Sequence, residues 1–201
     1  MKRFLSLALL PLLVVCSLGA CSSKTGTTGS SDTPVLETPA GDVPTAAAND
    51  VIALDLSFTD PQLADTVTIA GFMPSFGISP ALRDKFSAGL NGGVVSLVEV
   101  QAQTGGEYYS SIVAGRFRLI CNDQRSVPQT SPFADEMTTA GFPPFPDSGI
   151  SAGESGDYWI AFLVSGDPNP TDCTLSYTRD AAVESGTGDE IPEFTTTVQL
   201  N

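Results

Sequence analysis

The sequence predicts an all-β fold, a single jelly-roll-like β-sandwich of about eight strands that follows a disordered N-terminal tether. Apolar and polar residues alternate with a period of two in several short segments. The 19 glycines and 15 prolines of the chain recur in the gaps between those segments. No long stretch repeats its apolar residues at helical spacing, which favours strands over helices throughout.

The expected strands are short and separated by turn-forming residues. In the segment 116–121, Phe117, Leu119 and Cys121 fall on one face and the arginines on the other. The segment 157–165 is apolar almost throughout, which is typical of a central strand covered on both faces. The strands are expected over residues 51–58, 66–70, 93–102, 107–113, 116–121, 157–165, 173–177 and 194–200.

The chain begins with the features of a secretory signal peptide. Lys2 and Arg3 precede an apolar run over residues 4–15, and small residues follow. The run is short for a bilayer span, is broken by Pro11 and has no charged cluster after it, which disfavours an uncleaved membrane anchor. Residues 1–20 are therefore predicted to be cut away on export.

A cysteine follows the small residues directly. The sequence Leu18-Gly19-Ala20-Cys21 resembles the lipobox of bacterial lipoproteins. The resemblance implies that Cys21 receives a diacylglycerol and becomes the first residue of the mature protein, whose acyl chains then bind the membrane. Cys16 follows the bulky Val15 and lies too early in the apolar run. A secreted, unlipidated protein with an incidental cysteine is the remaining alternative.

Residues after the lipidated cysteine bear on localisation and organisation. Ser22 and Ser23 stand where enterobacterial lipoproteins retained in the inner membrane carry Asp, so the resemblance favours lipid anchoring in the outer membrane, on its periplasmic face or at the cell surface. Residues 21–50 hold Cys21 and a Ser/Thr/Gly/Pro tether of about 30 Å that cannot bury a core. Residues 51–201 are expected to form the sandwich domain.

Charge and composition exclude several function classes. The chain carries 23 acidic and 9 basic residues, a net charge of −14 that argues against a nucleic-acid partner. Histidine is absent, which removes Ser-His-Asp and Cys-His catalysis and most zinc sites. A Ser-Lys dyad would have to use Lys24 or Lys85, neither of which lies in a suitable pattern. The protein is expected to be no enzyme, with no catalytic residues assigned.

Two cysteines remain once Cys16 is cut away and Cys21 is acylated. Cys121 and Cys173 each fall on the apolar face of a predicted strand. Export to an oxidising compartment predicts a disulfide between them. The disulfide would close a loop of about 50 residues and would stabilise the domain by roughly 4 kcal/mol.

Five short segments follow one another between residues 84 and 178. They are 84–87, 92–97, 116–123, 155–160 and 173–177. Their order resembles the bacterial pre-peptidase C-terminal domain, a small jelly-roll-like sandwich often appended to secreted proteases. The resemblance implies an accessory or substrate-binding module. The segment 124–149 is longer than that family's pattern, and a further strand follows at 194–200.

Two phenylalanine- and proline-rich stretches echo each other. Phe72 and Phe76 lie in the first, Phe142 and Phe145 in the second. Displayed at one end of the sandwich, they would offer rigid aromatic faces to a glycan or peptide. The alternative is that all four fill the ends of the core, since apolar side chains are more often buried.

One turn has oxygen ligands at alternate positions. Asp167, Asn169 and Asp172 suit a weak calcium site, although an Asn/Asp/Pro turn explains them equally well. No other cofactor is expected.

These observations lead to one functional hypothesis and two alternatives. The first is a lipid-anchored, non-catalytic β-sandwich that serves as a binding or structural module for a glycan, an envelope protein or an extracellular polymer. The second is a hydrolase or processing accessory that uses carboxylates. The third is a calcium-dependent adhesion module.

Overall fold

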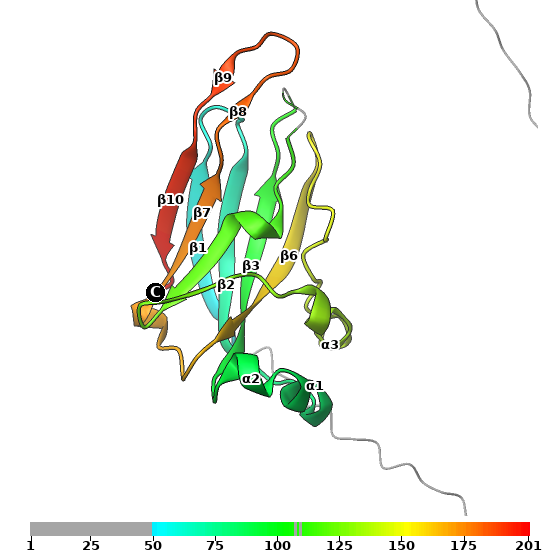
Figure 1. Cartoon of the computed structure of the whole chain (residues 1–201), viewed down its shortest axis with the longest axis vertical. Coiled ribbons are helices and arrows are strands. Elements are labelled where there is room, and N and C mark those ends of the chain that lie inside the picture. Colours follow the sequence, from blue (N-terminus) through cyan, green and yellow to red (C-terminus); the bar gives the residue numbers. More distant parts are fainter. Residues whose placement is uncertain (1–49, 107, 109) are drawn as a thin grey trace, which may run out of the picture. The chain divides into compact units, whose positions relative to one another are not determined.

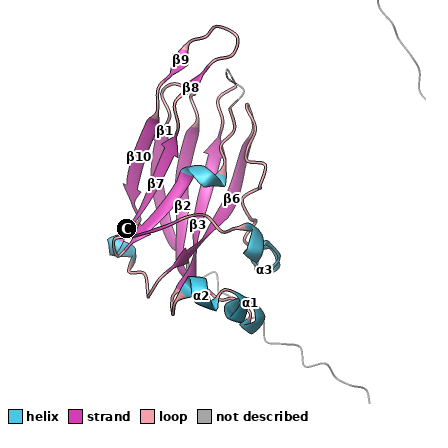
Figure 2. Cartoon of the chain, viewed as in Figure 1, coloured by secondary structure: helices cyan, strands magenta, loops and turns pink. Residues whose placement is uncertain are grey.

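The computed structural model describes residues 50–106, 108 and 110–201 of the chain (Figures 1 and 2). The predicted signal peptide, Cys21 and the tether up to residue 49 lie outside the described residues. The described domain is an all-β sandwich, as the alternating pattern predicts. No helix among these described residues is long and apolar enough to cross a membrane.

Two antiparallel four-stranded sheets form the sandwich. The first has the order β1-β2-β3-β6 and the second the order β10-β7-β4-β5. The small hairpin β8-β9 extends beyond them (Figure 1). The strands of the first sheet are β1 (Ile52–Thr59), β2 (Thr66–Phe76), β3 (Val94–Gln103) and β6 (Ser155–Val164). Those of the second sheet and the hairpin are β4 (Phe117–Cys121), β5 (Gln124–Ser126), β7 (Cys173–Arg179), β8 (Ala182–Val183), β9 (Glu190–Ile191) and β10 (Phe194–Gln199).

Short helices connect the strands. A Pro at the first position and a Ser79 cap begin α1, the helix next to β2. In Figure 1, α1 and α2 lie at the end of the sandwich opposite to β8-β9. The α-helices are α1 (Pro80–Lys85), α2 (Ser87–Leu90) and α3 (Ala134–Thr139), and the 3₁₀ turns are η2 (Ala114–Arg116), η3 (Ser131–Phe133) and η4 (Pro170–Asp172).

The main core lies between the two sheets. Tyr177 packs against Phe117 with ring centroids 5.1 Å apart, and the ring centroid of Phe58, on the edge strand β1, lies 5.2 Å from that of Tyr177. Phe194 of β10 closes the same edge, 6.4 Å from Phe58. The edge strands β1 and β10 are thus joined by aromatic contacts.

A second core covers the outer face of the first sheet. Its residues come from β2, β3 and β6 on one side and from α2 and the segment 131–142 on the other. Phe76 packs edge-to-face on Phe142 at 5.8 Å, and Phe142 on Trp159 at 5.0 Å. Sheet one therefore buries apolar side chains on both faces, which accounts for the nearly continuous apolar sequence of β6.

The position of β6 corrects the sequence prediction in part. Both its faces are covered, as expected, but β6 is an edge strand and not a central one. The segment 126–145, and not a further strand, forms backbone hydrogen bonds with the outer edge of β6. Trp159 N–H donates to the Pro143 carbonyl at 2.7 Å, and Gln129 N–H donates to the Ala161 carbonyl at 2.7 Å. The long 124–149 insertion thus protects an edge that would otherwise pair with another chain.

Two local predictions differ from the structure. The described residues of 107–113 form no strand, and Ile112 makes an isolated bridge with Ile150. Strand β5 was not expected from the sequence. Asn122 and Asp123 both have positive φ, 52° and 63°, which makes a two-residue turn whose twist suits a tight hairpin.

The predicted disulfide is confirmed. Cys121 and Cys173 are directly opposite each other on β4 and β7, with Cα atoms 4.2 Å apart. Both are fully buried within the main core. The bond joins neighbouring strands of one sheet and closes a loop with a sequence separation of 52 residues.

We expect the double substitution Cys121→Ala/Cys173→Ala to lower the free energy of unfolding by about 4 kcal/mol, because the unfolded chain regains its loop entropy. Urea denaturation of the two proteins under oxidising conditions measures this difference. An unchanged unfolding midpoint would contradict a structural role for the bond.

Candidate functional site

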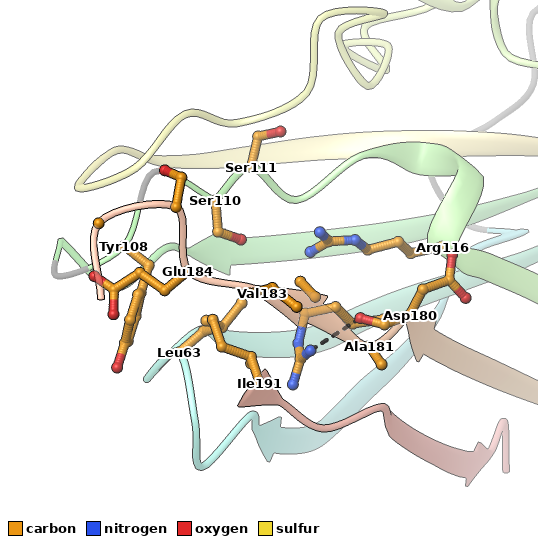
Figure 3. Close-up of a pocket in the computed structure, with 14 residues that line it drawn as sticks. Leu63, Tyr108, Ser110, Ser111, Arg116, Asp180, Ala181, Val183, Glu184 and Ile191 are labelled. Atoms are coloured by element: carbon orange, nitrogen blue, oxygen red, sulfur yellow. Dashed lines mark hydrogen bonds between the residues drawn. The ribbon is translucent and has the colours of Figure 1, made fainter. Parts of the chain in front are cut away.

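A cavity of about 630 Å³ opens at the β8-β9 end of the sandwich. Arg116 and Ser110 line one side and the chain from Asp180 into the hairpin lines the other, while Leu63 comes from the β1-β2 turn. In Figure 3 the Arg116 guanidinium extends into this space, on the side where Ser110 lies. Three separate parts of the chain therefore shape the cavity.

A buried ion pair supports the cavity from behind. Arg179 Nε lies 2.5 Å from Asp60 Oδ2, and its Nη2 lies 3.3 Å from Asp60 Oδ1. The side chains are 3% and 1% exposed. Arg179 Nη1 also donates to the Asp180 carbonyl at 3.1 Å, which fixes the start of the hairpin segment. The guanidinium thus joins β7 of the second sheet to the β1-β2 turn of the first.

Asp60 also shapes the turn that carries Leu63. Its Oδ1 accepts from the Gln62 N–H at 2.9 Å and from the Leu63 N–H at 3.4 Å. Ala64 stands at φ 56°, a left-handed conformation that costs a residue with a Cβ some free energy. One carboxylate therefore neutralises a buried cation and closes a tight turn.

The pKa of Asp60 reflects these contacts. Burial raises it, but the hydrogen bonds and charge of Arg179, together with the two turn N–H groups, outweigh burial and leave the pKa below its ordinary value. Asp60 is therefore ionised at neutral pH and paired with the arginine.

The Arg116 guanidinium is oriented by a hydrogen bond to a neutral hydroxyl group, in contrast to the ion-paired Arg179. Its Nη1 donates to the Tyr177 hydroxyl at 3.1 Å. Tyr177 is almost completely buried, and burial raises the pKa of its hydroxyl, which stays neutral and able to accept from Arg116. The contact orients the guanidinium without neutralising its charge.

Two buried polar atoms near Arg116 lack a hydrogen-bond partner among the described residues. They are Asp65 Oδ2 and Ser110 Oγ. The other Asp65 oxygen accepts from the Gly105 N–H at 2.9 Å. Burial raises the pKa of Asp65, while the Gly105 N–H and the charge of Arg116 act in the opposite direction. Unpartnered buried polar groups are uncommon, and they mark this end of the domain as one prepared for a further contact.

A second polar region lies on the outer face of the first sheet. Gln101 Nε2 donates to Asp157 Oδ2 at 3.4 Å. The pKa of Glu99 is raised by burial and by the neighbouring Asp157 carboxyl. The hollow beside Asp157 is lined mainly by threonine and glutamine side chains.

The phenylalanines predicted to form binding loops do not form them. Phe72 is 0% exposed, Phe76 2%, Phe142 6% and Phe145 2%. Phe72 and Phe145 belong to the main core, and Phe76 and Phe142 to the second core. The exposed-aromatic hypothesis is wrong, because sheet one has two faces to cover and these rings supply the apolar area.

In the turn predicted to bind calcium, two of the candidate ligand side chains form hydrogen bonds within the turn itself. Asn169 Nδ2 donates to Asp172 Oδ2 at 3.0 Å, and Asn169 Oδ1 accepts from the Thr171 N–H at 3.4 Å. Asp167 lies just before this turn. Within the ranges that the structure describes, no group of three or more His, Cys, Asp or Glu side chains is placed to hold a metal ion. Calcium binding stays a prediction.

Sequence patterns do not identify the cavity residues, although one feature of the sequence points to the buried arginine beside the cavity. Cys173, Leu175, Tyr177 and Arg179 share a face of β7, so alternation alone places an arginine among core side chains. A buried arginine requires a carboxylate. The partner, Asp60, is 119 residues away in sequence, and no local pattern identifies it.

Comparisons with known proteins do not identify a family for this chain. No family model and no curated protein matches the chain. Among solved structures, the chain is similar to a functionally unknown protein from Listeria monocytogenes EGD-e, with 13% sequence identity and a TM-score of 0.42. The match covers 76% of this chain and 88% of that one. At this score the likeness carries no argument, and the pre-peptidase resemblance stays a prediction.

We expect Asp60→Asn to lower the free energy of unfolding by about 3–5 kcal/mol, because it leaves the buried Arg179 charge uncompensated. The double substitution Asp60→Asn/Arg179→Met should recover much of this loss, because it removes the buried charge and keeps a side-chain oxygen for the turn N–H groups of Gln62 and Leu63. Asp180→Asn, at an exposed neighbour, is the control and should change stability by less than about 0.5 kcal/mol. Urea denaturation at neutral pH measures all three.

The same substitution has a defined pH dependence. The folded-state pKa of Asp60 lies below the ordinary value of 3.8, so its stabilising effect is fully present above that value and is lost as the pH falls through the folded pKa. The stability difference between wild type and Asp60→Asn should therefore narrow in acid. A difference that is constant from neutral to acid pH would contradict the assignment.

Proposed function

We propose that this chain is a lipid-anchored protein of the bacterial cell envelope whose sandwich binds a ligand in the cavity beside Arg116. The observation that carries the proposal is the cavity itself, with an oriented cation at its wall and a hydroxyl that has no hydrogen-bond partner among the residues described. Cavities of this size with a few converging polar groups are the usual form of small-ligand sites.

The state of the ionisable groups favours binding over catalysis. Asp60 and Arg179 form an ion pair with each other, and Arg116 donates a hydrogen bond to the Tyr177 hydroxyl. A guanidinium held in place, such as that of Arg116, can orient a ligand, but an arginine does not exchange a proton near neutral pH as general acid–base catalysis requires. The site is therefore proposed as non-catalytic.

Membrane attachment is proposed on the lipobox resemblance. Two or three acyl chains on Cys21 would hold the protein stably, whereas the acidic composition offers no electrostatic attraction to anionic lipid. Anchoring in the outer membrane would place the cavity among envelope polymers and proteins.

Anchoring is tested by metabolic labelling with a fatty-acid analogue in a bacterial host. Wild type and the control Cys16→Ser should incorporate the label and Cys21→Ser should not, because only the lipobox cysteine receives the diacylglycerol. Label on Cys21→Ser, or an unlabelled wild type, would exclude the lipoprotein assignment.

Ligand binding is tested with a matched pair of substitutions in the mature chain, residues 21–201 carrying Cys21→Ser. Ala181 lines the cavity and Ala88 lies on α2 at the other end of the domain, and both are exposed. Ala181→Trp should fill the cavity and weaken saturable binding to envelope fragments of the native host by about tenfold or more, a loss of about 1.4 kcal/mol. Ala88→Trp should bind like wild type.

Two results would contradict the proposal that the cavity binds the ligand. Equal binding by wild type and both variants would place the interaction elsewhere on the molecule. Absence of saturable binding by wild type would remove the proposed binding function.

A further inference from the structure

The charge of Arg116 is available to the cavity. Among the described residues, the ion pair formed within 4.0 Å is that of Arg179 with Asp60, and Arg116 has no such carboxylate. Its contact with Tyr177 uses one of its two Nη atoms. A guanidinium carries five N–H donors in a planar fork that matches a carboxylate.

Ser110 supplies a second donor on the same wall. Its Oγ is buried and has no hydrogen-bond partner among the described residues, although the residue lines the cavity with Arg116. In Figure 3 the Ser110 hydroxyl and the Arg116 guanidinium point toward the same space. An acceptor placed there would satisfy both donors, and a hydrogen bond to an ionised acceptor is stronger than one between neutral groups.

The surrounding carboxylates disfavour an acceptor that carries more than one negative charge. The carboxylate residues Asp180 and Glu184 line the cavity together with Arg116, and the charge of Arg179 is already neutralised by Asp60. Asp65 is a further carboxyl group in this region, close enough for the charge of Arg116 to act on its pKa. A doubly charged phosphate or sulfate would meet more repulsion here than a carboxylate would.

Part of the remaining wall is apolar. Leu63, Val183 and Ile191 line the cavity, and Val183 is 64% exposed, which is unusual for a large apolar side chain in this domain. Leu63 is already buried at 4% exposure, whereas Val183 and Ile191 still expose apolar area. An apolar group of the ligand would remove that area from water, which contributes about 25 cal/mol per Å².

We propose that the cavity binds a monocarboxylate with an apolar body, such as the free carboxyl terminus of a peptide that ends in an apolar residue. Its carboxylate lies between the Arg116 guanidinium and the Ser110 hydroxyl, and its apolar group lies on Leu63, Val183 and Ile191. This inference rests on the proposed function, for which it supplies the ligand class.

The test measures binding of N-acetyl-leucine and of its amide to the mature chain, residues 21–201 with Cys21→Ser, by NMR titration. The acid should bind about tenfold more tightly than the amide, because the charge-assisted hydrogen bonds are lost with the carboxylate. Arg116→Gln should remove this preference, and Ser110→Ala should reduce it.

Arg118→Gln is the matched control. Arg118 follows Arg116 by two residues, but its guanidinium donates to the Gly115 and Phe117 carbonyls and it lines a different hollow. This variant should keep the preference for the acid. Because Arg116→Gln also removes the contact with Tyr177, its unfolding midpoint is measured alongside, and Ser110→Ala tests the site independently of that contact.

Four outcomes overturn the inference: equal binding of acid and amide, an unchanged preference in both site variants, tighter binding of inorganic phosphate, or tighter binding of glucuronate, whose body is polar. If any of these outcomes is found while Ala181→Trp still weakens envelope binding, the cavity remains the binding site and the ligand class is wrong. If Ala181→Trp has no effect on envelope binding, the proposed function fails as well.

Discussion

The ion pair between Asp60 and Arg179 is the constraint on which the cavity end of the domain depends. Two charges removed from water are tolerated when they are paired and hydrogen-bonded, and here the pair lies where the two sheets meet the β1-β2 turn. The same carboxylate closes the turn that carries Leu63, and the same guanidinium holds the Asp180 carbonyl at the start of the hairpin segment. Walls from both sheets are thereby fixed relative to each other.

The second core determines where a binding site can lie. Because the first sheet is covered on its outer face by Phe76, Phe142 and their neighbours, much of that face is closed to ligands. The segment 126–145 likewise occupies the outer edge of β6 through backbone hydrogen bonds. At the end with the β8-β9 hairpin, Asp65 Oδ2 and Ser110 Oγ are buried without a hydrogen-bond partner from the described part of the chain, and the cavity opens there.

Local patterns in the sequence predict most of this architecture, and the exceptions have physical causes. Alternation identifies β4 and β7 and turns both cysteines inward, so the disulfide can be predicted from the sequence pattern together with the predicted export. It cannot tell that β6 is an edge strand, since burial by a loop and burial by a strand need the same apolar side chains. The site depends on long-range pairs: Arg179 is visible as an inward arginine, but its partner Asp60 and the contact of Arg116 with Tyr177 arise only from the folded chain.

The anchor proposed at Cys21 would hold at the envelope a domain whose cavity presents Arg116, a cation without a carboxylate partner among the described residues. A crystal structure of the mature chain grown with N-acetyl-leucine tests the central claim most directly. The account predicts the ligand in this cavity, with its carboxylate within hydrogen-bond distance of both the Arg116 guanidinium and Ser110 Oγ. Density for the ligand at another surface, or a carboxylate turned away from Arg116 toward solvent, would contradict it.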